Sequence, residues 1–168
     1  KKDGENIIGC YHNTRAIMQT AYSPRTNSLY VPFHDQCLSM TANAKSPTGW
    51  GPRQGIIRPG ADPQKYMNLG KIDVATGEMK ILFSQAAGAN GSALTTAGGL
   101  VFFGDLNRRL RALDDESGKV LWTAIVGGMV MTSTVTYSVN GKQYLMVFTG
   151  EGQSLTTNPL RLTGKLMP

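Results

Sequence analysis

Residues Thr96–Trp122 read T-A-G-G-L-V-F-F-G-D-L-N-R-R-L-R-A-L-D-D-E-S-G-K-V-L-W, and this stretch decides the fold class. It alternates short apolar runs with turns that are rich in Gly, Asp and Asn, with turns at 98–99, 104–107 and 114–118 and strands expected at 100–103, 110–113 and from 119 onward. Three short strands joined by tight turns predict the meander of a small antiparallel sheet.

The turn pattern Asp-x-x-Ser/Thr-Gly occurs at 73–77 and again, 41 residues later, at 114–118. Ile81 holds the position after the first turn that Trp122 holds after the second, and residues 23–27 form a weaker third copy. A repeat of this length is typical of the four-stranded blades of a β-propeller, which need about 40–45 residues each. The internal repetition therefore predicts a propeller without reference to any known family.

Each part of the pattern has a physical reason. The side chain of Asp114 can cap the turn, and Gly118 can take a positive φ without steric cost. Asn27, which ends the weaker copy, can also adopt the left-handed conformation. Trp122 is expected to lie flat between two blades as a large apolar wedge.

The length of 168 residues corresponds to about four such blades, whereas propellers contain up to eight. We therefore expect residues 1–168 to be the C-terminal portion of a larger propeller domain. The 20 glycines and the modest charged fraction of 17% suit a turn-rich, all-β protein.

The chain carries a formal net charge of +6. Its basic residues are scattered apart from Arg108, Arg109 and Arg111, and no nucleic-acid-reading motif accompanies them. We therefore expect no nucleic-acid partner. The positive charge is also compatible with a basic surface that attracts an acidic redox partner. The apolar runs are too short to span a membrane.

Two sequence features leave alternatives open. The two cysteines, Cys10 and Cys37, are either buried thiols or one disulfide formed in an oxidising compartment. Residues 43–66 contain four prolines and no periodicity, and are expected to be a long loop insertion on one face of the propeller. That loop is either a rim over a central site, with Trp50 or Arg53 touching substrate, or a surface insertion packed by Trp50.

Several phrases resemble one known family. The pattern Ala-x-Asp-x-x-Ser-Gly-x-x-x-Trp at 112–122 resembles the A-x-D-x-x-T-G-x-x-x-W docking motif of the quinoprotein alcohol and methanol dehydrogenases, which hold pyrroloquinoline quinone (PQQ). The phrases A-Y-S-P-R-T-N-S-L-Y-V-P at 21–32 and V-T-Y-S-V-N-G-K-Q-Y-L-M-V-F-T-G at 135–150 also resemble this family. The resemblance implies an eight-bladed β-propeller, of which this chain would be the C-terminal part.

The resemblance also implies an activity. Its members oxidise an alcohol to an aldehyde or ketone with PQQ and a bound Ca²⁺ or lanthanide, and pass electrons to a cytochrome c in the periplasm. It favours a Cys10–Cys37 disulfide, and places the metal ligands and the catalytic Asp in earlier blades, outside this chain segment. No catalytic or metal-binding residue is therefore expected here.

Four residues match positions near the quinone in the resembling enzymes. Asn13 and Arg15 follow the first cysteine, and Asn90 and Gly91 precede the phrase at 94–103. Asn90 stands where many members have Trp, and its amide can hydrogen bond to the quinone. Loop capping is the competing role for Asn13 and Arg15. The missing Trp favours the alternative function, a non-catalytic propeller that acts as a scaffold or outer-membrane assembly factor.

Overall fold

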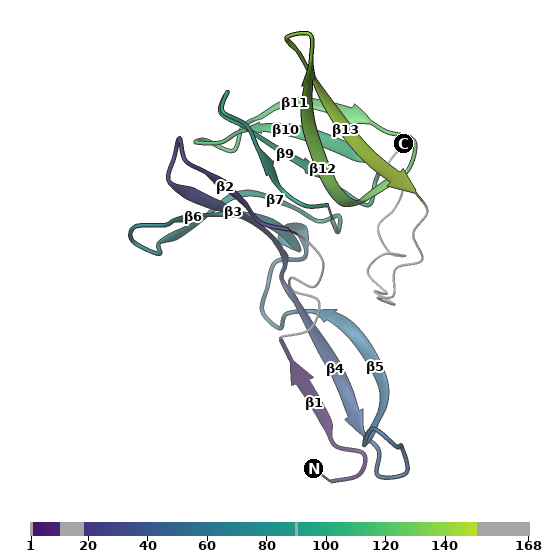
Figure 1. Ribbon diagram of the computed structural model, residues 1–168. Helices are drawn as coiled ribbons and strands as arrows, with labels where there is room; N and C mark the ends of the chain where they lie inside the picture. The colour runs from purple at the N-terminus through teal and green to yellow at the C-terminus, as the bar shows by residue number, and fades with distance from the viewer. Residues whose placement is uncertain (1, 11–18, 90, 151–168) are drawn as a thin grey trace.

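The computed structural model describes residues 2–10, 19–89 and 91–150. They form four antiparallel sheets and one short 3-10 helix (Figure 1). The elements are β1 (Asn6–Gly9), β2 (Ala21–Ser23), β3 (Ser28–His34), β4 (Gln36–Ala42), β5 (Trp50–Ile57), η1 (Pro63–Lys65), β6 (Met67–Asp73), β7 (Met79–Gln85), β8 (Leu94–Thr95), β9 (Leu100–Gly104), β10 (Arg109–Asp114), β11 (Val120–Ile125), β12 (Met129–Val139) and β13 (Lys142–Gly150). The all-β prediction is confirmed, and no membrane-spanning helix occurs within these ranges.

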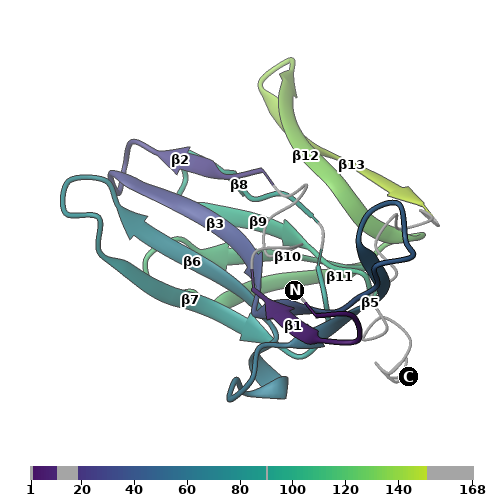
Figure 2. The ribbon, with the colours of Figure 1, turned by 90° about the horizontal axis from the view of Figure 1, so that it is seen from below.

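Two of the sheets are complete four-stranded blades. The first blade has the strand order β2-β3-β6-β7, and the second has the order β8-β9-β10-β11. They lie side by side, as Figures 1 and 2 both show. A fully buried apolar core fills the space between them, formed by Tyr30, Tyr66, Met67, Leu69, Ala89, Ala93, Val101, Phe103 and Leu113.

The two repeated turns have the geometry that the sequence predicts. The Asp114 carboxylate accepts hydrogen bonds from the backbone nitrogen of Ser117 at 2.7 Å and from its hydroxyl at 2.7 Å. The Asp73 carboxylate caps the turn of the first blade in the same way, and Gly77 and Gly118 both have a φ of 74°. Asn27 adopts the left-handed conformation with a φ of 46°, as expected.

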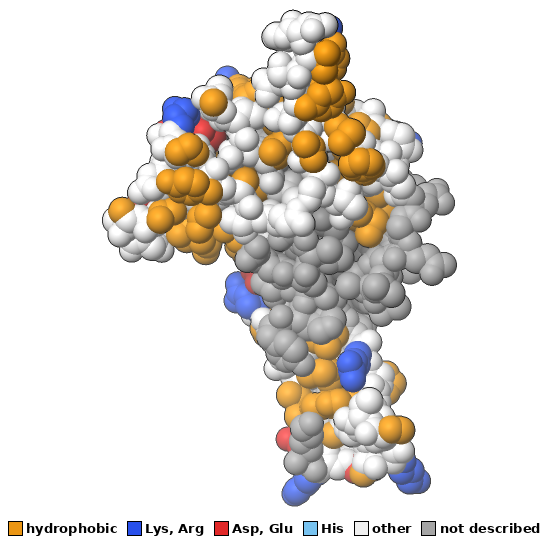
Figure 3. Space-filling view, viewed as in Figure 1, with side chains coloured by type: hydrophobic (Ala, Val, Ile, Leu, Met, Phe, Trp, Pro, Cys, Tyr) orange, Lys and Arg blue, Asp and Glu red, His pale blue; other side chains and the backbone are white. Residues whose placement is uncertain are grey.

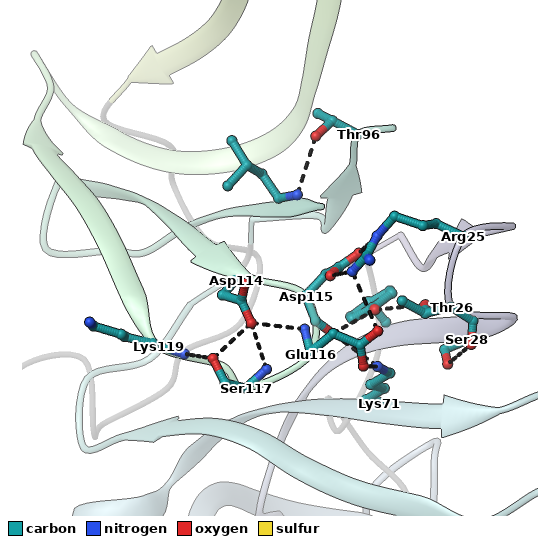
Figure 4. Close-up of polar contacts among 12 residues, drawn as sticks. Arg25, Thr26, Ser28, Lys71, Thr96, Asp114, Asp115, Glu116, Ser117 and Lys119 are labelled. Atoms are coloured by element: carbon teal, nitrogen blue, oxygen red, sulfur yellow. Dashed lines mark hydrogen bonds and ion pairs between the residues drawn. The ribbon is translucent and has the colours of Figure 1, made fainter. Parts of the chain in front are cut away.

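The turn of the second blade docks onto the first blade (Figure 4). The backbone oxygen of Asp115 accepts hydrogen bonds from the Tyr30 hydroxyl at 2.8 Å and from Lys71 Nζ at 3.0 Å. The buried Asp115 carboxylate pairs with Arg25, and Lys71 also binds the Glu116 carboxylate at 2.8 Å. The capped turn therefore connects β10 to β11 and also holds the second blade against the first.

Hydrogen bonds and burial at this seam between the blades shift the pKa values of three side chains. The hydrogen bond from Lys71 lowers the pKa of Glu116 below its usual value. Burial raises the pKa of Tyr30. The backbone hydrogen bond from Ser117 lowers the pKa of Asp114. The lowered pKa values of Asp114 and Glu116 favour the charged form of these two carboxylates.

Trp122 does not form the expected wedge within the described residues, because it is 48% exposed. It pairs with Ala112 across β10 and β11, on the face of the second blade that carries Phe102. The hairpin β12–β13 has only two strands and lies against β8, β9 and β10. Within the described residues, β11, the outer strand that bears Trp122, is therefore not covered by a four-stranded blade.

The β12–β13 hairpin has one apolar face. Its register places Val135 opposite Met146 and Tyr137 opposite Tyr144. The two tyrosine rings stack at 5.4 Å, and these side chains are between 39% and 48% exposed. Figure 3 shows hydrophobic side chains gathered along this part of the molecule. A sheet face of this composition is suited to packing against another layer of the propeller.

The sheet β1-β4-β5 is an arm that projects from the blades (Figure 1). The chain leaves the first blade after β3, runs along the arm in β4 and β5, and returns to β6. Arg58 and Asp35 close the neck of the arm through two hydrogen bonds of 2.6 and 2.9 Å. The Cys10–Cys37 disulfide joins the segment after β1 to β4.

The expectation that residues 43–66 are a loop without regular structure is wrong for part of that segment. Residues 50–57 form β5, which pairs along β4 from Gln36 to Ala42, and 63–65 form η1, which Asp62 caps by accepting from the Gln64 backbone nitrogen at 2.9 Å. Pro52 is compatible with this strand because β5 lies at the edge of its sheet, where a missing backbone donor is tolerated. Trp50 and Arg53 therefore lie on the arm.

Candidate functional site

The described neighbours of the residues expected near a quinone meet at one place, although they come from two distant parts of the chain. Asn13, Arg15 and Asn90 lie outside the described residues. Their described neighbours are Gln19 on one side, and Ala89, Gly91 and Ser92 on the other. We call the contacts that hold residues 89–92 to Gln19 and β12 the 89–92 junction.

Gln19 connects the two parts. Its backbone nitrogen donates to Ser92 Oγ at 2.9 Å, and its backbone oxygen accepts from Ala93 at 3.1 Å. Its side-chain oxygen accepts from the hydroxyls of both Ser92 and Ser133. The end of the segment that carries Asn13 and Arg15 is thereby fixed against the segment that carries Asn90, although Gln19 and Ser92 are 73 residues apart.

The strand β12 supports the junction from a third direction. The backbone nitrogen of Ser92 donates to the Thr132 carbonyl at 3.5 Å, and Ser133 binds Gln19. Thr134, close by, is 5% exposed, and its hydroxyl has no hydrogen-bond partner among the described residues. The junction thus unites the hairpin β12–β13 with the start of the second blade.

Gly91 has a packing reason for being glycine. A Cβ at this position would lie 2.6 Å from the carbonyl oxygen of Gly104 and 3.1 Å from its carbonyl carbon. Only glycine allows two backbone segments to approach this closely. The structure therefore explains Gly91 through contact with β9, and a cofactor contact by this residue stays a prediction.

Ala89 is held from the side of the first blade. It is fully buried, and its backbone nitrogen donates to His34 Nε2 at 3.0 Å. The His34 ring stacks on Tyr66 with centroids 4.8 Å apart, and the Tyr66 hydroxyl donates to the Gln36 side chain. Residues 89–92 are consequently anchored on both sides of Asn90. Composition alone could not show this role for His34, because an isolated histidine carries no motif.

A buried ion pair lies beneath the loop that precedes the junction. Asp105 is fully buried and accepts from Arg111 Nη1 at 2.8 Å and from the Gln85 side chain at 3.3 Å. It also caps its own turn by accepting from the backbone nitrogens of Asn107 and Arg109, each at 2.9 Å. Asp105 therefore caps its own turn and also links the second blade to Gln85 of the first.

Arg111 differs from its expected place in a surface patch. It is only 9% exposed, and its guanidinium lies 5.5 Å from the centre of the Phe83 ring in the first blade. The alternation of β10 could have revealed this, because Arg111 shares a face with Leu113, which lies in the core between the blades. Within the described ranges, no group of three or more His, Cys, Asp or Glu side chains is placed to hold a metal ion.

The family model described as the glucose/ethanol/alcohol dehydrogenase β-propeller domain, the PQQ family, matches residues 11–145. The chain belongs to this family. The expected quinoprotein family and propeller fold are therefore confirmed.

Curated relatives are dehydrogenases and a hydroxylase. The chain is 32% identical over 148 residues to lupanine 17-hydroxylase [cytochrome c] from a Pseudomonas species, covering 84% of this chain and 20% of that protein. It is 29% identical over 143 residues to lanthanide-dependent methanol dehydrogenase from Methylorubrum extorquens, covering 83% and 24%. The chain thus spans about a fifth to a quarter of the length of these relatives.

Solved structures show the same fold. A europium-containing methanol dehydrogenase superposes with a TM-score of 0.74 at 24% identity, over 89% of this chain and 27% of that one. The quinohemoprotein alcohol dehydrogenase from Comamonas testosteroni superposes with a TM-score of 0.60 at 25% identity, over 82% and 22%. The blades of this chain are therefore arranged as in those propellers.

Proposed function

We propose that this chain is part of a quinoprotein dehydrogenase that oxidises an alcohol to an aldehyde or ketone with PQQ and a bound Ca²⁺ or lanthanide. The observation that carries the proposal is the family match over residues 11–145. The names of the relatives support it, since they include a lanthanide-dependent methanol dehydrogenase and a 1-butanol dehydrogenase (cytochrome c) from Thauera butanivorans. We further propose a cytochrome c as electron acceptor and a periplasmic location, with which the Cys10–Cys37 disulfide is compatible.

The residues next to Asn90 support the proposal of a rigid wall for a quinone. The stretch 86–92 consists of small residues apart from Asn90, and at 86–88, which are at least partly exposed, a flat ring could approach the backbone closely. Ala89 and Ser92 are buried and hydrogen bonded, which keeps this wall rigid. Rigidity of this kind is what a site needs to orient a cofactor.

When bound, PQQ supplies the carbonyl that accepts the hydride of the alcohol carbon. The part of this chain is to bind and orient: the amides of Asn90 and Asn13 and the guanidinium of Arg15 would donate hydrogen bonds to the quinone carboxylates and carbonyls. We assign the metal ligands and the catalytic base to earlier blades, outside this segment, as the family resemblance implies.

The test uses the protein purified from its natural source. We expect quinone absorbance that changes on addition of a primary alcohol, with reduction of an added cytochrome c. The apo-protein should regain this spectrum with PQQ and either Ca²⁺ or La³⁺. Failure to bind PQQ with either metal would reject the dehydrogenase and leave the non-catalytic scaffold.

The site residues are tested by substitution. Asn90→Ala should weaken PQQ binding, and Asn13→Ala and Arg15→Ala should do the same. Asn6→Ala is the matched control, because Asn6 is an exposed amide on the arm that pairs with Ser39. Equal PQQ affinity in the Asn90 variant and the control would exclude Asn90 from the site.

A further inference from the structure

The hydrogen bond from Ala89 to His34 has an unusual position. It crosses from the first blade to the residue directly before Asn90, over a sequence separation of 55. Both partners are buried, with His34 4% exposed and Ala89 fully buried. A buried backbone N–H that loses its acceptor destabilises the structure around it.

The histidine ring is itself held in place. It stacks on Tyr66 with an interplanar angle of 9°, and Tyr66 is fixed by its hydrogen bond to Gln36. Gly88 lies against both rings, since a Cβ there would be 3.6 Å from the Tyr66 ring and 3.8 Å from His34 Nε2. The ring therefore presents Nε2 to residue 89 in one fixed direction.

We propose that His34 is a positioning residue of the quinone site: by accepting from Ala89, it fixes the backbone of residue 89, the neighbour of Asn90 in the sequence. This inference rests on the proposed function, because it requires Asn90 to lie beside PQQ. His34 touches neither quinone nor substrate in this role. To accept this hydrogen bond, Nε2 must carry no proton, so the role belongs to the neutral imidazole.

Other contacts make the effect specific to one side of Asn90. Gln19 and the Thr132 carbonyl hold Ser92, on the far side of Asn90. Removing the acceptor at His34 would therefore free residue 89 while residue 92 stays anchored. The expected result is a displaced residue 89, and with it weaker PQQ binding, in an otherwise folded blade.

Three variants of the intact apo-protein separate positioning from general stability. His34→Phe keeps an aromatic ring to stack on Tyr66 and removes the acceptor. His34→Gln restores an acceptor, because the Gln side-chain oxygen can reach the position of Nε2. Tyr30→Phe is the control, since it removes the hydrogen bonds of the Tyr30 hydroxyl to the Asp115 carbonyl and to Thr26, at the other end of the seam between the blades.

The measurement is the PQQ dissociation constant, taken from fluorescence quenching on titration with PQQ and Ca²⁺ or La³⁺, with the urea midpoint of each apo-variant alongside. We expect His34→Phe to bind PQQ about tenfold more weakly. His34→Gln should stay within about threefold of the wild type. Tyr30→Phe should lower the urea midpoint and leave PQQ binding unchanged.

Three results would overturn the positioning role while leaving the dehydrogenase intact: wild-type affinity in His34→Phe, equal weakening in His34→Phe and Tyr30→Phe, or no rescue by His34→Gln. A wild-type protein that binds no PQQ with either metal would reject the proposed function and this inference together.

Discussion

Gly118 offers a sharp test of how the two blades are joined. It has a φ of 74°, and a Cβ there would overlap the carbonyl oxygen of Leu82 in β7 of the first blade. Gly118→Ala therefore adds two separate costs: backbone strain, and a collision between two backbones that no side-chain rotation can relieve. Gly141, at the tip of the β12–β13 hairpin, has a φ of 76° and no atom within 4 Å of its Cβ position. Gly141→Ala therefore measures the cost of backbone strain alone.

The magnitudes follow from these contacts. An alanine in the left-handed conformation costs about 1–2 kcal/mol, which is the whole effect expected for Gly141→Ala. In Gly118→Ala the turn must also move away from β7. That movement disrupts the hydrogen bonds from Tyr30 and Lys71 to the Asp115 carbonyl, which contribute about 1 kcal/mol and about 2 kcal/mol. We expect a total loss of about 4–5 kcal/mol for Gly118→Ala.

Urea unfolding of the two variants and the wild type measures these losses, provided that the slope of each transition is unchanged. A cycle that adds Tyr30→Phe gives a second check. If the turn is displaced in Gly118→Ala, the Tyr30 hydroxyl has already lost its bond to the Asp115 carbonyl and keeps only that to Thr26, so the two single losses will sum to more than the double variant shows. Equal losses for Gly118→Ala and Gly141→Ala would refute the docking of the turn onto β7.

Three other perturbations have defined outcomes. Cys37→Ser should lower the free energy of unfolding by about 3 kcal/mol, and a reductant should lower that of the wild type but not of the variant. Because the backbone hydrogen bond from Ser117 depresses the pKa of Asp114, the stability from this carboxylate is present above its unfolded pKa of about 4 and is lost as the pH falls through the lower folded value. Urea midpoints should therefore fall from about pH 5 to pH 3, and Asp114→Asn should flatten that slope, whereas an unchanged slope would contradict the assignment. Asp105→Ala should cost about 3–5 kcal/mol by leaving the Arg111 guanidinium buried without its partner, and adding Arg111→Met should recover part of the loss in thermal or urea unfolding.

The local turns could be predicted because each one is decided within five residues. Asp73 and Asp114 cap the nitrogens two and three positions ahead, and the glycine that follows supplies the positive φ. The strands β6 and β9–β13 follow from the same signals, since turns and apolar alternation bound them. The 41-residue repeat then predicts the propeller.

Part of the candidate site was predictable only through resemblance. The Cys10–Cys37 pairing is present as the resemblance implied. The positions of Asn13, Arg15 and Asn90 relative to a quinone stay predictions. What could not be foreseen is the way their neighbours meet, because Gln19 and Ser92 are joined across 73 residues and no local pattern encodes that contact.

The amino-acid sequence by itself determined the strands, the capped turns and the blade repeat of this protein, since backbone preference and side-chain alternation act over a few residues. The tertiary structure decided the rest. β5 is a strand because it pairs with β4, and Arg111 is buried against Asp105. Trp122 is half exposed, and His34 lies where its Nε2 accepts a hydrogen bond from Ala89. Each of these outcomes depends on which distant segment packs alongside, and packing is a property of the assembled blades.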